Sequence, residues 1–123
     1  MELVRKEDLL FPHTEDGKAL PEEVEVKELG GKVKVLPVLP NEWGALAEKA
    51  QSMAESNEDF DGMIIKKQVV EPKLAEEEIK FLKPQAKAAI AKAVLRVSGF
   101  PVESVEALQG GAKKEEAKSK NPV

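Results

Sequence analysis

The segment NEDFDG at residues 57–62 is the part of the sequence whose residue types and spacing come closest to a chemical site. Its oxygen-bearing side chains and its glycine match positions 1, 3, 5 and 6 of a calcium-binding helix–loop–helix template: Asn57, Asp59, Asp61 and Gly62. Position 8 is the apolar Ile64, but position 12 is Gln68, where the template has a bidentate glutamate. Because only two charged ligands remain, the pattern favours a loop that caps a helix, with Phe60 pointing inward, over a calcium site.

The histidine, the cysteine count and the glycine pairs bear on catalysis and nucleotide binding. His13 is the sole histidine and has no neighbouring serine, cysteine or tyrosine, so we interpret it as a solvated loop residue. The absence of cysteine excludes disulfides, thiolate metal sites and a cysteine nucleophile. Neither Gly30-Gly31 nor Gly110-Gly111 precedes a lysine-serine pair and a helix, so neither forms a phosphate-binding loop. The sequence predicts a protein that is not an enzyme and that binds no cofactor and no metal.

The charge pattern limits the kinds of partner. The 23 acidic and 19 basic residues are interspersed, which gives a net charge of -4 and no basic stripe that would neutralise phosphates. We therefore expect no nucleic-acid partner. The amino terminus lacks the apolar core of a signal peptide, and no run approaches the roughly 18 apolar residues of a membrane span. We expect a cytoplasmic protein without membrane contact, and its bias toward lysine and glutamate would suit a thermophilic source.

The chain length of 123 residues has room for one domain, which we place at residues 24–109. Residues 1–23 show no sustained period and are predicted to be an extended lead-in. The apolar residues available to anchor this lead-in are Leu9, Leu10 and Phe11. Residues 110–123 have almost nothing to bury and are predicted to be a disordered charged tail.

A β-hairpin is predicted at the start of the domain. Valines alternate with charged residues on both sides of Gly30-Gly31, and a glycine pair at this position is typical of a two-residue turn with positive φ at both residues. The outward-facing charges, Glu25 and Lys27 against Lys32 and Lys34, favour the pairing modestly.

Helical periodicity dominates the rest of the domain and predicts an α+β fold, mainly α, with an N-terminal β-hairpin followed by about four helices in a small bundle. The first helix has an apolar stripe from Trp43 to Ala54 and a cap at Asn41. The other predicted helices span residues 60–69, 74–82 and 84–97, with one or two further turns over 102–108. Ser98-Gly99 is a strong stop signal for the 84–97 helix.

Two features of these helices are candidates for protein binding. Trp43 could anchor an interface, although a tryptophan on a regular apolar stripe favours the core. The 84–97 helix carries a second apolar stripe opposite its main one, made of Ala88, Ala91 and Leu95. A helix that is apolar on two faces lies either at the centre of the fold or against a partner, and the sequence leaves both possibilities open.

Three segments in a fixed order resemble a known family. They are ELGGKVKVLPVLPNEW at 28–43, IIKKQVVEPKLAEEEIKFL at 64–82 and AIAKAVLRVSG at 89–99. Together they give a glycine-turn hairpin, a proline-rich entry ending in Glu-Trp, a Val-Glu-Pro break and a closing Ser-Gly. In this order they resemble the tail assembly chaperones of long-tailed phages and related prophages.

The resemblance implies a non-catalytic chaperone that binds the tape measure protein, helps tail tube protein assemble around it, and is absent from the finished tail. It implies a location in the cytoplasm of the host cell, possible self-association and no catalytic residues. Two other functions stay open. One is a structural head–tail connector or tail-completion protein, which would remain in the particle. The other is a regulatory protein-binding adaptor.

Overall fold

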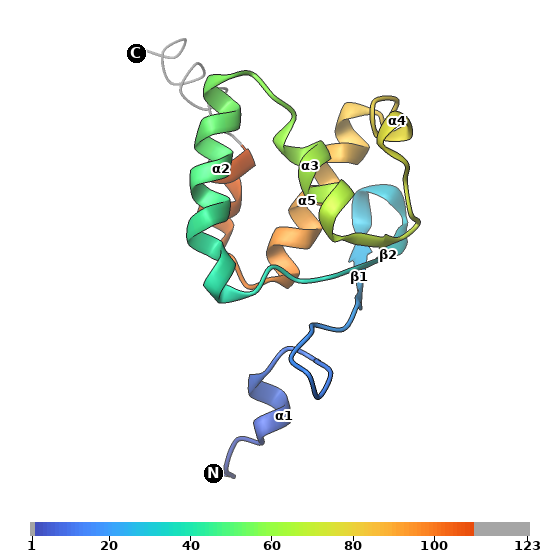
Figure 1. Ribbon diagram of the computed structural model, residues 1–123. Helices are drawn as coiled ribbons and strands as arrows, with labels where there is room; N and C mark the ends of the chain where they lie inside the picture. Colours follow the sequence, from blue (N-terminus) through green and yellow to red (C-terminus); the bar gives the residue numbers. More distant parts are fainter. Residues whose placement is uncertain (1, 110–123) are drawn as a thin grey trace, which may run out of the picture.

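The computed structural model describes residues 2–109, which form a mainly helical fold around one small antiparallel sheet (Figure 1). The elements in chain order are α1 Lys6–Leu9, β1 Glu22–Val26, the 3-10 turn η1 Lys27–Leu29, β2 Gly31–Val35, the 3-10 turn η2 Pro40–Glu42, α2 Trp43–Glu55, α3 Phe60–Gln68, β3 Val69–Glu71, α4 Glu76–Ile79 and α5 Pro84–Val97. Residues 102–109 are also helical. The predicted α+β, mainly α class is confirmed, whereas the tail predicted at residues 110–123 lies outside the described residues.

The hairpin is present, but its turn differs from the prediction. β1 and β2 pair antiparallel with Val24 opposite Val33 and Glu25 opposite Lys32, so the predicted charge pairing holds for that pair. The connection is η1 rather than a two-residue turn. Gly30 alone has positive φ, at 68°, and Gly31 already belongs to β2. A 3-10 turn that ends in a left-handed glycine joins the strands, and Lys27 lies in that turn and not on a strand.

The third strand was not predicted. β3 follows α3 without a break and pairs antiparallel with β2, which gives the strand order β1-β2-β3. The junction is held by two contacts between Gln68 and Leu36: Leu36 N–H donates to the Gln68 carbonyl at 2.7 Å, and Gln68 Nε2 donates to the Leu36 carbonyl at 2.6 Å. Three residues are too few to show a strand period, and the predicted helix over residues 60–69 included the first residue of β3, Val69.

Helix α5 has the predicted bounds, beginning at Pro84 and ending at Val97. Proline suits the first turn of a helix, and Gly99 takes the left-handed conformation, with φ of 99°, that ends one.

Two other helix predictions differ from the structure. The helix predicted at 74–82 is shorter, because only α4 is formed there. Asn41 does not cap α2, because it lies inside η2, where the Glu42 side chain accepts from the Leu39 N–H at 3.3 Å.

The prediction of a partner-binding stripe on α5 is wrong for two of its three residues. Ala91 and Leu95 are fully buried in the core, and the side of α5 predicted as its main stripe is buried as well. The reason is that α5 runs through the centre of the fold, packed against β1, η1 and α3 (Figure 1). Residues 102–109 also return to it, with Gln109 Nε2 donating to the Ala88 carbonyl at 2.9 Å. Only Ala88 of the stripe is exposed.

Trp43 lies at the edge of this core. Its ring is half-buried and stacks on Phe100 with the centroids 4.2 Å apart, and its Nε1 donates to the Val38 carbonyl at 3.1 Å. These contacts tie the start of α2 to the segment after α5, so Trp43 is a packing residue rather than a free anchor.

Ser98 is a buried polar residue that fastens the end of α5 to the segment after β2. Its Oγ accepts from the Val38 N–H at 2.7 Å and donates to the Val94 carbonyl at 2.7 Å, and the residue is 1% exposed. We expect Ser98→Ala to lower the free energy of unfolding by about 1–3 kcal/mol, because it leaves the buried Val38 N–H without its acceptor. Denaturant unfolding measures this loss. The exposed Ser52→Ala is the control, and equal stability of the two variants would contradict the assigned role.

Candidate protein-binding site

The loop at 57–62 caps the start of α3. Asp59 is the N-cap of α3: its Oδ1 accepts from the Gly62 N–H at 3.0 Å, and its Oδ2 forms an ion pair with Lys87 Nζ at 2.7 Å. Gln68, the residue at template position 12, donates to the sheet junction instead of facing the loop. Phe60 is buried, as expected. Across residues 2–109 no group of three or more potential ligands could hold a metal ion.

Calcium or zinc at millimolar concentration should therefore leave the melting temperature unchanged. An ion that bound only the folded state would raise the melting temperature by mass action. Thermal unfolding with and without each ion tests this, and a clear upward shift that Asp59→Asn removes would establish the loop as a site.

His13 belongs to a small closed loop in the lead-in. It forms an isolated bridge with Ala19, and its Nδ1 lies 2.8 Å from the Phe11 carbonyl oxygen. The base of the loop is closed by the Leu20 N–H, which donates to the Pro12 carbonyl at 2.9 Å. The lead-in is thus more structured than the extended segment predicted, with one helical turn, α1, and one closed loop.

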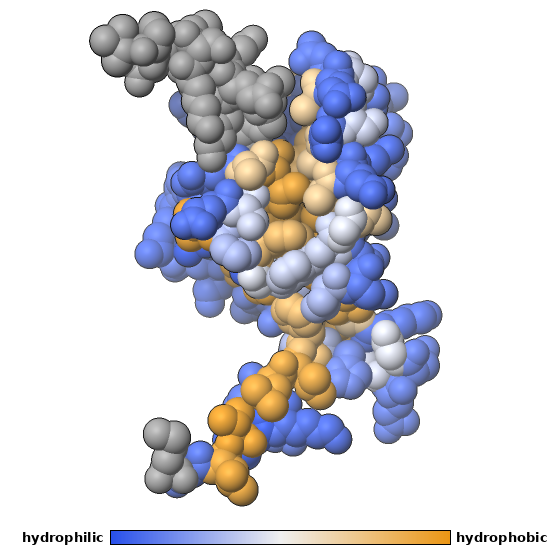
Figure 2. Space-filling view, turned by 90° about the vertical axis from the view of Figure 1, so that its left-hand side faces the viewer, coloured by the Kyte–Doolittle hydropathy of each residue, from blue (hydrophilic) through white to orange (hydrophobic). Residues whose placement is uncertain are grey.

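The residues before this loop form an arm that projects from the body (Figures 1 and 2). We define the arm as residues 2–11. Its apolar side chains do not anchor it: Leu3 is 95% exposed, Val4 68%, Leu9 70% and Leu10 48%. Figure 2 shows them as a continuous apolar row, and α1 contains no buried residue. So many exposed apolar side chains on one short segment are typical of interaction surfaces.

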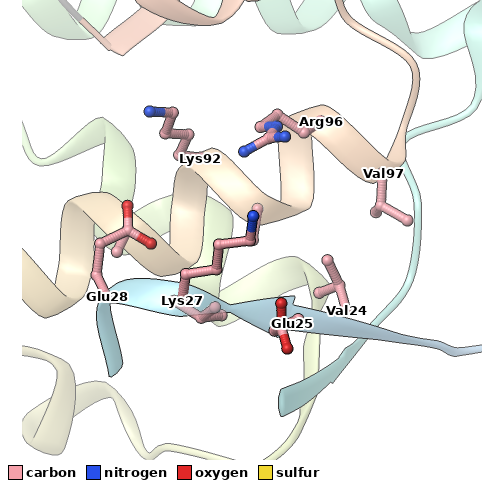
Figure 3. A pocket seen from close by; sticks show the side chains of 10 residues that line it. Val24, Glu25, Lys27, Glu28, Lys92, Arg96 and Val97 are labelled. Atoms are coloured by element: carbon pink, nitrogen blue, oxygen red, sulfur yellow. The ribbon is translucent and has the colours of Figure 1, made fainter. Parts of the chain in front are cut away.

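A second feature is a groove between α5 and the β1–η1 segment, with a volume of about 510 Å³ (Figure 3). Apolar side chains of both elements line it, with charged residues at its borders: Val24, Glu25, Val26, Lys27, Glu28, Ala89, Lys92, Ala93, Arg96 and Val97. Lys92 and Arg96 are one helical turn apart on α5 and have no ion pair with any described residue. β1 is an edge strand of the sheet, so its outer edge has no strand neighbour among the described residues.

Sequence reasoning missed both features as sites. The groove joins residues far apart in the chain, and no local pattern reports that contact. The arm did carry a signal, because Leu9, Leu10 and Phe11 stand close together in a segment without a period. The prediction assigned them to anchoring, whereas Leu9 and Leu10 are exposed.

Fold and surface define an α+β domain whose most prominent feature is an apolar arm, and in residues 2–109 no helix is long and apolar enough to cross a membrane. No protein-family model, curated protein or solved structure matches the chain significantly.

Proposed function

We propose that the protein is a non-catalytic tail assembly chaperone that binds the tape measure protein of a phage or prophage in the host cytoplasm and aids assembly of the tail tube. The observation that carries the proposal is the arm, with Leu3, Val4, Leu9 and Leu10 all exposed. Such a row supplies the apolar contact that an aggregation-prone client needs. The resemblance of residues 28–99 to tail assembly chaperones supplies the identity of the client.

Charge supports the same proposal. The chain is 34% charged with a net charge of -4, which keeps it soluble while it exposes apolar side chains. The buried interior is closed: Ile64, Val94 and Leu95 are at most 1% exposed. Client binding therefore uses the arm and requires no opening of the core.

Co-expression with the tape measure protein encoded beside it tests the proposal. We expect the client to move from the insoluble to the soluble fraction, because the arm covers apolar segments that would otherwise associate. Mass spectrometry of purified particles is the second measurement, and it should find none of this protein. A client that stays insoluble, together with the protein present in mature particles, would replace the chaperone by a structural connector or tail-completion protein.

A further inference from the structure

We propose that the groove between α5 and β1 is the binding site for the arm of a second copy of this chain. In this arrangement the apolar arm is covered while no client is bound. The inference rests on the proposed function and describes the protein in its client-free state. It is a head-to-tail contact, in which each copy offers an arm at one surface and a groove at another.

The sizes of the two surfaces agree. The groove follows α5 from Ala89 to Val97, a rise of about 12 Å along the helix. An extended segment covers that length with about four residues, at about 3.3 Å each. The arm offers Glu7, Asp8, Leu9, Leu10 and Phe11. α1 must unwind for this, and a single turn with no buried residue has little stability to lose.

The chemistry of the two surfaces is complementary. Neighbouring side chains of an extended segment point to opposite sides, so one leucine of the Leu9-Leu10 pair would enter between the apolar walls formed by β1 and α5, next to Val24 and Ala93. Glu7 and Asp8 come directly before the leucines and would lie on the α5 side of the groove, where Lys92 and Arg96 are (Figure 3). The β1–η1 side carries the mixed charges of Glu25, Lys27 and Glu28. The unpaired edge of β1 offers backbone donors and acceptors to an added extended segment.

The groove of the same chain is a less suitable site for the arm than the groove of a second copy. The loop at residues 12–20 is closed by antiparallel backbone hydrogen bonds. For the arm to lie along β1 of its own chain, this antiparallel pairing would have to continue between the arm and β1. Pro12 and Pro21 flank the base of that loop and have no N–H to donate, so the ladder ends there. Beyond Pro12 the arm diverges from β1 (Figure 1). The groove of another copy has no such restriction.

Sedimentation velocity of the full chain over a range of micromolar concentrations tests the proposal. We expect the average mass to rise with concentration. The arm variant Glu7→Lys with Asp8→Lys and the groove variant Lys92→Glu with Arg96→Glu should each raise the dissociation constant about tenfold or more, because each places like charges together. The control Lys49→Glu with Lys80→Glu makes the same charge change as the groove variant at exposed sites elsewhere and should associate like the wild type.

Mixing the arm variant with a second groove variant gives the decisive result. Ala93→Glu blocks the apolar wall of the groove, and Val24→Glu is the alternative where Ala93→Glu impairs folding. The groove variant keeps an intact arm, and the charge-reversed arm variant keeps an intact groove. One such pair of surfaces is therefore available, so a mixture of the two variants should form a one-to-one dimer and nothing larger. A monomeric wild type at all concentrations, or association unchanged in both the arm and the groove variants, would overturn the proposal. If the wild type is monomeric but still solubilises the client, the arm–groove contact between copies is contradicted while the proposed chaperone function is not.

Discussion

Replacing Leu95 by alanine should lower the free energy of unfolding by about 2–5 kcal/mol. Leu95 is fully buried in the last turn of α5, the helix against which β1, η1 and α3 pack, so its removal opens a cavity in the core that these elements share. Replacing it by glutamate should prevent folding, because an unpaired carboxylate would lie in the core. Urea denaturation of the alanine variant and circular dichroism of the glutamate variant measure these effects.

Ala88→Glu is the matched control, because Ala88 comes from the same apolar stripe but is exposed. Its stability should stay within about 0.5 kcal/mol of the wild type. If Leu95→Glu folded normally, or if Ala88→Glu destabilised the domain as much as Leu95→Ala, the central position of α5 would be contradicted.

Replacing both Leu9 and Leu10 by glutamate should abolish solubilisation of the tape measure protein while the domain keeps its stability. Each leucine contributes about 1.5–3 kcal/mol when it is buried against a client, so the loss of both corresponds to a weakening of binding of about a hundredfold or more. Both side chains are exposed, and neither is among the apolar residues packed against the buried core. The soluble fraction of the client in co-expression measures the effect.

Phe81→Glu is the matched control for the arm, because Phe81 is 87% exposed and lies outside the arm. This variant makes the same apolar-to-acidic change and should leave solubilisation intact. Equal loss of solubilisation in the Phe81 and arm variants would assign client binding to general surface hydrophobicity rather than to the arm.

Local sequence signals predicted α5 well, because several independent signals agree on its bounds. Pro84 gives the start, Gly99 the stop, and the apolar period between them is long enough to define a helix. Which face of that helix meets solvent is a property of the whole fold. The second stripe became core because residues 102–109 and the sheet enclose α5, and the periodicity of a helix does not report how many neighbours it has.

The sheet shows the same limit. The alternating valines predicted β1 and β2, but the glycine pair allowed more than one turn, and the observed 3-10 turn uses positive φ only at Gly30. β3 depends on pairing with β2 and on the contact between Gln68 and Leu36, both of which are tertiary. The groove likewise exists only after β1 and α5 have packed.

Affinity purification of the tagged chain from cells that also express the tape measure protein tests the central claim most directly. The account predicts that the client copurifies with the wild type and with the Phe81→Glu variant, and that it is lost with the Leu9→Glu, Leu10→Glu double variant. Absence of the client from the wild-type preparation, under conditions where both proteins are produced and the domain is folded, would contradict the claim.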